Sequence, residues 1–301
     1  WRSEGVRRSE MRWGQVLVWV LYRCFAGVVM ALPLSLARIL MASVFGALGP
    51  FSVRSTARMD RTLKIAFPFR DEFWRRDRRA ATWRNLGRSV AESIKTQTLQ
   101  RQRATHVTYR FEPELTLSRD DPRGQLLLMG HLGAWEMAIQ IVPQLGRPVM
   151  GVYRPLKNPM IEADLQESRK AAGIEMVSIE DPSLVRRALK HLKAGGLLAV
   201  FVDQRWAQGE MLDLFGQPAL TTLSPGLFQH LTGARVSTLI CRRSGRSRYE
   251  AILENLPFKS QDEDDWRARG RSIMRAFHGR LEDWVRGHPD DWYWLQERWK
   301  P

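Results

Sequence analysis

Cysteine is scarce in this chain: only Cys24 and Cys241 occur among its 301 residues. Neither has a neighbour at metal-binding spacing, so the sequence predicts no metal site and no disulfide framework, and it favours a reducing compartment. A P-loop, a dinucleotide-binding glycine fingerprint and the G-x-S-x-G elbow are also missing. Their absence argues against a P-loop nucleotidase, a Rossmann dehydrogenase and a serine hydrolase.

Acidic residues are also scarce relative to basic ones. The chain has 32 Asp and Glu against 47 Lys and Arg, a formal net charge of +15 and a pI of about 10.6. Such an excess favours an anionic partner, which can be nucleic acid, anionic lipid or an acidic protein. No helix-turn-helix, zinc-finger or RNA-binding signature accompanies the charge, so we expect no nucleic-acid partner.

Residues 54–110 hold much of this charge, with fifteen Lys and Arg against five Asp and Glu. We predict a basic helical region here, whose arginines either form a solvated surface or attach to anionic headgroups. Headgroup attachment is worth about 1 kcal/mol for each basic residue near a membrane surface, and the apolar segment that precedes the region favours it. The apolar residues that recur at helical intervals and should face inward are Trp74, Trp83, Leu86, Val90 and Ile94.

Residues 13–49 form a long apolar segment in which Arg23 and Arg38 are the only charged residues. Pro33 is predicted to separate two helical pieces, because proline removes a helical hydrogen bond. We predict a membrane anchor within residues 1–53, either spanning the bilayer or lying in one leaflet. The alternative is a buried helical hairpin of a soluble protein. The arginines that precede the segment and favour a cytoplasmic N-terminus are Arg2, Arg7, Arg8 and Arg12.

From residue 125 onward, short apolar strands alternate with helical patterns. This predicts an α/β domain within residues 54–301, with a mixed, mostly parallel sheet flanked by helices. The predicted strands occupy 126–129, 148–153, 175–179, 197–203, 235–242 and 247–254. The predicted helices occupy 134–144, 158–172, 182–193, 225–232 and 264–286.

Polar side chains lie at the ends of three predicted strands. His131 follows the first strand, Arg154 follows the second, and Asp203 ends the fourth. Because sites in open α/β sheets form beyond the carboxyl ends of the strands, we expect a site at this edge. A structural acid at a strand end is the alternative interpretation of Asp203.

The stretch MGHLGAWEMA, residues 129–138, places His131 five positions before Glu136. In one continuous helix the two side chains would point about 140° apart. If His131 lies in a turn and Glu136 in the first turn of a helix, they can meet, and Gly130 and Gly133 make such a turn easy. Glu136 would then accept one imidazole N–H and leave the other nitrogen as a base. A capping glutamate and a structural histidine are the alternative.

The segment Gly130-His-Leu-Gly-Ala-Trp-Glu136 resembles the His-x4-acid motif of the lysophospholipid and lipid A acyltransferase superfamily. Later segments resemble blocks of its bacterial lipid A late (lauroyl/myristoyl) acyltransferases, and the resemblance implies a glycerolipid acyltransferase-like fold. Gln296 departs from the pattern, because such endings commonly carry a histidine there. The later segments are Val152-Tyr-Arg-Pro-Leu-Lys-Asn-Pro159, Val202-Asp-Gln204, Leu214-Phe-Gly-Gln-Pro-Ala219 and Pro289-Asp-Asp-Trp-Tyr-Trp-Leu-Gln-Glu-Arg-Trp-Lys300.

The resemblance implies transfer of a fatty acyl chain to a hydroxyl of a lipid A precursor or related saccharolipid. The donor would be an acyl carrier protein or coenzyme A thioester, with no further cofactor. The expected location is the cytoplasmic face of the bacterial inner membrane, and the expected partners are acyl carrier protein, the lipid acceptor and the membrane surface. A lysophospholipid, aminolipid or other glycolipid acceptor stays open, as does a non-enzymatic membrane-surface binding protein.

The resemblance also implies roles for single residues. His131 would remove the acceptor's proton and Glu136 would orient the imidazole. Arg169 resembles an arginine that the family uses near its active site, so it and backbone N–H groups would stabilise the oxyanion, with Asp203 in support. A surface helix arginine is the alternative for Arg169. The residues expected to bind substrate are Arg154, Lys157, Gly133 and Gln204.

Overall fold

The structure is a computed structural model that describes residues 13–96, 99, 107–111, 122–245, 248–259 and 265–299. Some predictions fall outside these residues. They concern the arginines at positions 2, 7, 8 and 12, and the element or motif ends at positions 247, 264 and 300.

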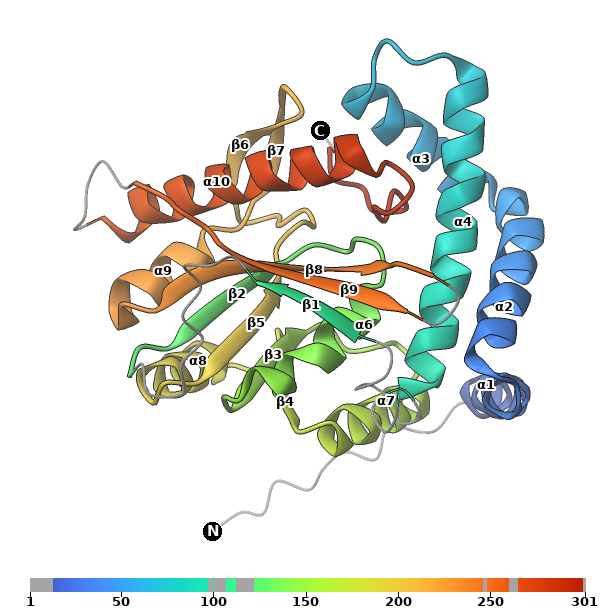
Figure 1. Ribbon diagram of the computed structural model, residues 1–301, viewed down its shortest axis with the longest axis horizontal. Helices are drawn as coiled ribbons and strands as arrows, with labels where there is room; N and C mark the ends of the chain where they lie inside the picture. The colour runs from blue at the N-terminus through green and yellow to red at the C-terminus, as the bar shows by residue number, and fades with distance from the viewer. Residues whose placement is uncertain are drawn as a thin grey trace.

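A seven-stranded sheet forms the centre of the molecule, in the order β1-β9-β8-β2-β5-β3-β4 (Figure 1). Neighbouring strands are parallel except β8 with β9. The mixed, mostly parallel sheet predicted from the sequence is therefore confirmed. Its strands are β1 (Val107–Phe111), β2 (Gln125–Met129), β3 (Val149–Tyr153), β4 (Ile174–Ser178), β5 (Leu197–Phe201), β8 (Arg235–Arg243) and β9 (Tyr249–Asn255).

The two faces of the sheet bury different side chains of the same strands. In β2, Leu126 and Leu128 belong to one apolar core, whereas Leu127 and Met129 belong to another. Successive residues of a strand point to opposite faces, so a strand covered on both sides needs a continuous apolar run. The first core includes α8 (Leu184–Lys193), α9 (Ser224–Thr232) and α10 (Trp266–Gly287), and the second includes α6 (Trp135–Ile141). Figure 1 shows α10 above the sheet and α6 below it.

Short polar side chains mark where several helices begin. Asn158 accepts backbone hydrogen bonds at the start of α7 (Pro159–Ala171), and Asp265 does so at the start of α10. Asp71 accepts the N–H of Trp74 at the start of α4 (Glu72–Ile94). A cap of this kind satisfies N–H groups that have no partner within the helix and typically stabilises it by about 1 kcal/mol.

Two predicted helical stretches differ in the structure. The helix expected over 134–144 is α6 followed by a 3-10 turn, η3 (Val142–Leu145). Pro143 has no N–H to continue the α-helical pattern, which explains the change. Residues 107–110, at the end of the region predicted to be helical, instead form β1 together with Phe111 at the edge of the sheet, where β1 pairs with β9.

A hairpin of β6 (Glu210–Leu214) and β7 (Gln217–Thr221) forms a separate two-stranded sheet, in a part of the chain for which the sequence predicts neither strand nor helix. Its turn residues, Phe215 and Gly216, both have positive φ, at 55° and 72°. Positive φ at both central residues is typical of a type I′ turn, whose twist matches the right-handed twist of the two strands.

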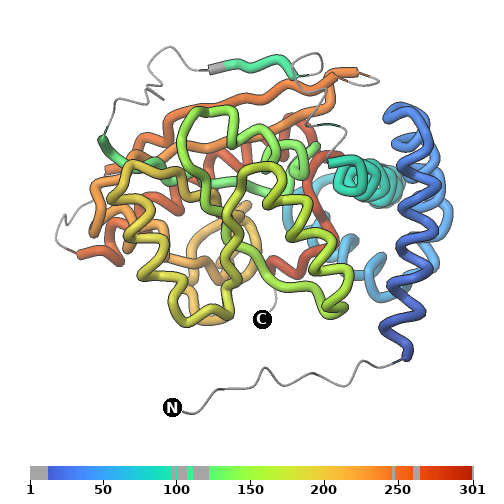
Figure 2. Tube along the Cα trace, turned by 90° about the horizontal axis from the view of Figure 1, so that it is seen from below, coloured from blue at the N-terminus to red at the C-terminus, as the bar shows by residue number. Residues whose placement is uncertain are grey.

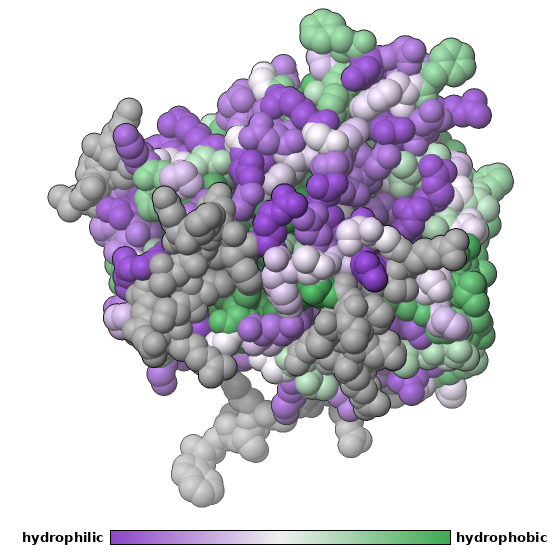
Figure 3. Space-filling model, in the orientation of Figure 1, coloured by the Kyte–Doolittle hydropathy of each residue, from purple (hydrophilic) through white to green (hydrophobic). Residues whose placement is uncertain are grey.

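The N-terminal segment forms two helices, α1 (Trp13–Ala31) and α2 (Leu34–Leu48), separated at Pro33 as predicted. By length and composition, α1 and residues Leu34–Phe51 are apolar enough to cross a membrane, so they can serve as a membrane anchor. Figures 1 and 2 show both helices as an outer layer beyond α4. Figure 3 shows apolar residues along the same edge of the molecule.

α2 packs tightly on α4. A Cβ on Gly87 of α4 would stand 2.2 Å from the backbone oxygen of Met41, so this close approach requires glycine. After α2 the chain continues through η1 (Gly49–Phe51) and α3 (Val53–Ala66) to α4. α2 is thus in direct contact with the rest of the described structure.

A buried ion-pair network also joins α4, α2 and the sheet. Glu92 of α4 is fully buried, and Arg243 of β8 donates to both of its oxygens at 2.8 and 2.6 Å. The hydroxyl of Tyr249 donates to Glu92 at 3.0 Å, and Nε of Arg38 lies 3.5 Å from the same oxygen. Arg243 also donates to the carbonyl of Gly133 at 2.9 Å, which fixes the loop after β2. A buried charge pair requires hydrogen bonds to its remaining polar atoms, because the two charges have lost their contact with water.

Candidate active site

The turn that carries His131 is held on both sides by the chain's C-terminal segment and β8. The N–H of Gly133 donates to the carbonyl of Asp291, and the N–H of Ala134 donates to that of Cys241, each at 2.8 Å. In return, the N–H of Tyr293 donates to the carbonyl of His131 at 2.9 Å. The backbone that places this histidine is therefore fixed at three successive points.

His131 and Asp203 form a directly hydrogen-bonded pair. The ring Nδ1–H of His131 donates to Oδ1 of Asp203 at 2.8 Å, and its backbone N–H donates to Oδ2 at 2.9 Å. Trp292 and Gln296 donate to the same Oδ2, at 2.9 and 3.3 Å. A carboxylate acceptor at Nδ1 fixes the tautomer of the neutral ring, so Nε2 carries the lone pair that can take a proton.

The charge of Asp203 is stabilised although the side chain is fully buried. Burial by itself raises its pKa, but the neighbouring His131 and the hydrogen bonds from His131 and Trp292 outweigh burial and hold the pKa below that of an ordinary aspartate. A lowered pKa means that the carboxylate is ionised at neutral pH. Its contribution to stability is lost only as the pH falls through that lowered pKa.

The acid that accepts the Nδ1–H of His131 differs from the one predicted from the sequence. The His-x4-Glu spacing predicts that Glu136 accepts the imidazole N–H, but Asp203 takes this bond and no hydrogen bond joins His131 to Glu136. The reason lies in the sheet: β2 and β5 are parallel neighbours, and Met129 pairs with Phe201. The residues two positions beyond each of these, His131 and Asp203, therefore lie side by side.

A cavity of about 660 Å³ opens beside this pair. His131 and Glu136 line it, so Glu136 belongs to the site although it does not orient the ring. The ring of Phe201 lies 4.4 Å from that of His131, centroid to centroid. Much of the remaining lining is apolar, and it includes Met129, Ile139, Val142, Val149, Ile174, Met176 and Ala199.

Three of the predicted substrate-contacting residues line the cavity, namely Arg154, Arg169 and Gln204. Arg154 follows β3 as predicted, and Arg169 comes from α7. The guanidinium carbon of Arg169 lies 5.9 Å from the ring centroid of Tyr153, near enough for a cation–π contact. Arg169 is therefore not simply a surface helix residue.

Two other predicted substrate-binding residues do not line the cavity. Lys157 is exposed outside it. Gly133 faces the backbone of β8, where a Cβ would stand 2.6 Å from the carbonyl oxygen of Cys241, and its φ is +55°. Its small size is required for packing and for the turn. The N–H groups of residues 131–134 all donate within the protein, so they cannot stabilise an oxyanion.

Sequence reasoning did not find the roles of three residues at the site. Trp292 and Gln296 hold Asp203 from the C-terminal segment, far away in sequence. Arg205 lines the cavity two residues after Asp203. Its position on the loop after β5 was the available signal, since that loop was already expected at the site. Within the part of the chain that the structure describes, no cluster of three His, Cys, Asp or Glu side chains could hold a metal ion.

These features define a class of enzyme. A strand-end histidine, oriented by a buried carboxylate and facing a largely apolar cavity, can act as a general base on a lipid substrate. The family model described as "Bacterial lipid A biosynthesis acyltransferase" matches residues 7–301, nearly the whole chain. The chain therefore belongs to this family, which is a family of acyltransferases. A comparison with curated proteins finds no match.

Proposed function

We propose that this protein transfers a fatty acyl chain from a thioester donor to a hydroxyl of a lipid A precursor or related saccharolipid. The observation that carries the proposal is the His131–Asp203 pair, whose free Nε2 faces a largely apolar cavity. The family match supports acyl transfer to lipid A-like acceptors.

In the first step, Nε2 of His131 takes the proton of the acceptor hydroxyl. The hydroxyl oxygen attacks the thioester carbonyl carbon, and the carbonyl electron pair moves to its oxygen. Asp203 stabilises the positive charge that forms on the imidazole, because its carboxylate accepts the Nδ1–H. General-base catalysis of this kind typically contributes a factor of about 10² to 10⁴ in rate.

In the second step, the tetrahedral intermediate collapses. The carbon–sulfur bond breaks, the carbonyl re-forms, and the departing sulfur takes the proton from Nε2 of His131. We assign the stabilisation of the oxyanion to Arg169, because it lines the cavity and the N–H groups of residues 131–134 are all bonded elsewhere.

We assign the remaining polar groups by charge. Glu136 lies in the same cavity and adds negative charge near the imidazolium that forms during the reaction. Arg154 lines the cavity and suits a phosphate of the acceptor or of the donor's phosphopantetheine, with the exposed Lys157 further out. Gln204 is assigned to acceptor hydroxyls. The acidic surface of acyl carrier protein would meet a strongly basic chain.

The apolar part of the cavity is proposed to hold the acyl chain, and Ala199 of β5 offers a test. In Ala199→Leu, we expect kcat/KM for the longest acyl donor to fall about 10- to 100-fold relative to a short donor, because a methylene group in an apolar pocket is worth roughly 1–3 kcal/mol. Transfer assays with donors of graded chain length measure this. Ala207→Leu, at an exposed position outside the cavity, is the matched control. Equal slowing of all donors would show that the chain does not lie there.

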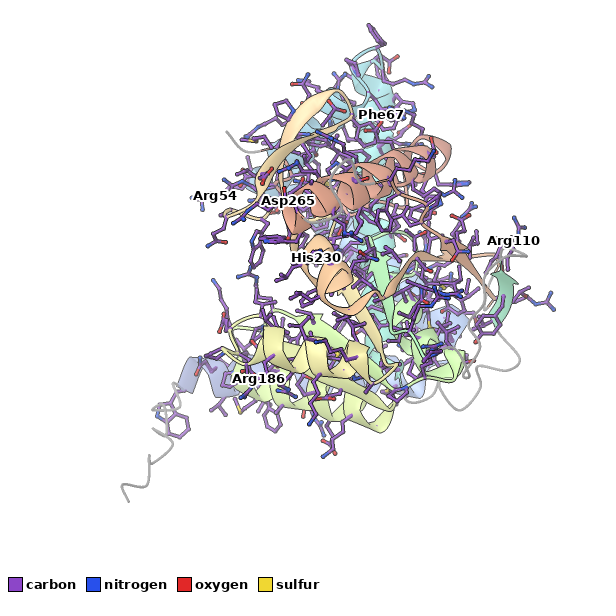
Figure 4. The ribbon with its side chains drawn as sticks, turned by 90° about the vertical axis from the view of Figure 1, so that its left-hand side faces the viewer. Arg54, Phe67, Arg110, Arg186, His230 and Asp265 are labelled. Carbon is purple, nitrogen blue, oxygen red and sulfur yellow. The ribbon has the colours of Figure 1, made fainter. Side chains whose placement is uncertain are left out.

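We propose that the protein acts at the cytoplasmic face of the inner membrane, anchored by α1 and α2. A second contact is proposed where α3 joins α4. Phe67 packs inward against Phe215 and Trp294, near the top of the molecule in Figure 4. The nearby Phe69 and Phe73 are instead 99% and 77% exposed. Aromatic side chains exposed among arginines suit an anionic lipid surface, where the rings enter the interface and the charges meet headgroups.

A site-specific fluorophore tests this second contact. With Cys24→Ser and the buried Cys241 retained, Phe69→Cys gives one reactive cysteine for an environment-sensitive label. On vesicles that contain anionic lipid, we expect its emission to shift to the blue and to be quenched by spin-labelled lipid. A label at Leu231→Cys, exposed on α9, should stay in water. The same aqueous emission from both labels would rule out the contact.

The experiment that tests the proposed function presents the purified full chain with acyl carrier protein and coenzyme A thioesters in turn. The acceptor panel includes phosphorylated disaccharide lipids, lysophospholipids, aminolipids and neutral glycolipids. We expect a phosphorylated disaccharide lipid to gain one ester-linked acyl chain, detected by mass spectrometry. Acylation of another class alone would move the assignment to that acceptor, and no transfer to any of them would favour a non-enzymatic membrane-binding role.

A further inference from the structure

Arg205 is a half-buried cationic side chain that lines the cavity. Its Nε is buried and has no hydrogen-bond acceptor. No hydrogen bond or ion pair is formed by its guanidinium among the described residues. Burying a charged donor without an acceptor is unfavourable, so such a group in a native structure calls for an explanation.

Other arginines show how unusual this state is. Within the described residues, Arg78, Arg147, Arg269 and Arg298 also have a buried Nε without a partner. Each of these four uses a terminal nitrogen: Arg78 pairs with Asp290, and the others donate to oxygens at 2.6 to 2.8 Å. Arg205 differs from them because the whole guanidinium is left without an acceptor while it lines the cavity.

The position of Arg205 places it close to the reaction. It lies two residues after Asp203, and two residues span at most about 7 Å of chain. The N–H of the next residue, Trp206, donates to the carbonyl of Leu220 on β7 at 3.2 Å, which ties this loop to the hairpin. The cavity lining also includes Arg154 and Arg169. Of its two acids, Asp181 is already paired with Arg187, which leaves Glu136 against three arginines. The unpaired charge that faces the cavity is therefore mainly positive.

We propose that Arg205 binds a phosphate group of a substrate, in a subsite adjacent to the His131–Asp203 pair. A guanidinium offers planar paired donors that match phosphate oxygens, and a bound phosphate would supply the missing acceptors. The inference rests on the proposed function, because both an acyl thioester with phosphopantetheine and a phosphorylated saccharolipid carry such a group. The group that both substrates share, and that Arg205 would bind, is a phosphate ester close to the reacting carbonyl.

Arg205→Gln in the full chain, compared with wild type, tests the subsite and identifies the phosphate. One arm measures KM for a 4′-phosphopantetheine thioester and for the same pantetheine thioester without phosphate. The other arm measures KM for an acceptor with and without its sugar phosphate. We expect KM to rise about 10-fold or more for one phosphorylated partner, which corresponds to at least about 1.4 kcal/mol. The effect should vanish for the same partner without phosphate and be partly restored in Arg205→Lys.

The matched control is Arg186→Gln, an exposed arginine of α8 outside the cavity, labelled in Figure 4. Binding of 4′-phosphopantetheine and of a sugar phosphate, followed by calorimetry, gives a readout independent of turnover. Weaker binding of either ligand by Arg205→Gln alone would support the subsite even if no acceptor is turned over. Unchanged KM values and unchanged binding in Arg205→Gln would overturn the proposal while leaving acyl transfer itself intact.

Discussion

His131→Ala is expected to lower kcat/KM for acyl transfer by about 10² to 10⁴, the typical contribution of a positioned general base. The imidazole is the group at this site whose free Nε2 can take the proton of the acceptor hydroxyl and return it to the leaving sulfur. KM for either substrate should change much less than kcat, because the histidine acts on the reacting hydroxyl rather than on the lipid body. Initial rates with a saturating thioester and a graded acceptor measure both quantities.

His230→Ala is the control for this variant, because His230 lies on α9 outside the cavity (Figure 4). His230→Ala should unfold at the temperature of the wild type, whereas His131→Ala should unfold at a lower temperature, because it leaves the buried carboxylate of Asp203 without the Nδ1–H that it accepts. The rates are therefore compared at a temperature where both variants are folded. A His131→Ala protein that transfers acyl chains at the wild-type rate would remove the base from the mechanism.

Asp203→Asn is expected to have the second large effect on the rate of acyl transfer. The amide that replaces the carboxylate can donate to Nδ1 of His131, which would move the ring proton to Nε2 and remove the base. In a serine protease triad, an aspartate orients the catalytic histidine in the same way. Its replacement by asparagine lowers kcat there by up to about 10⁴. We therefore expect a loss on the order of 10² to 10⁴ in kcat, with the fold retained because the amide keeps the shape of the side chain.

Glu136→Gln is the comparison that decides between the two acids. Glu136 lines the cavity without a hydrogen bond to His131, so its loss should reduce kcat clearly less than the loss of Asp203. Assays of kcat for the two variants under the same conditions measure this difference. If Glu136→Gln were as inactive as His131→Ala while Asp203→Asn stayed active, Glu136 would be the orienting acid and the contact seen here would be structural.

The sequence predicts local features of the site well. His131 lies in a turn between a buried strand and a helix, and Arg154 follows the next strand, as expected from apolar runs and glycines. These features depend on residues that are neighbours along the chain. The helix break at Pro33 was foreseen for the same reason.

The partner of His131 depended instead on strand order. β5 lies next to β2 although β3 and β4 intervene in sequence, and no local pattern shows that adjacency. The same holds for Trp292 and Gln296, which reach Asp203 from the other end of the domain. Gly133 illustrates a further limit: a glycine beside a catalytic residue suggests substrate contact, yet its small size serves close packing against β8.

Direct acyl transfer at His131 is the central claim, and one time course tests it most directly. Wild-type protein is mixed with a labelled acyl thioester and a phosphorylated disaccharide lipid, and the reaction is quenched at intervals. The masses of the lipid and of the intact protein are then measured by mass spectrometry. We expect the label to pass to the lipid as one ester, with no labelled protein at any time and no transfer in His131→Ala. An acyl-protein adduct that forms and decays at the rate of product formation, or a lipid that stays unlabelled, would contradict the account.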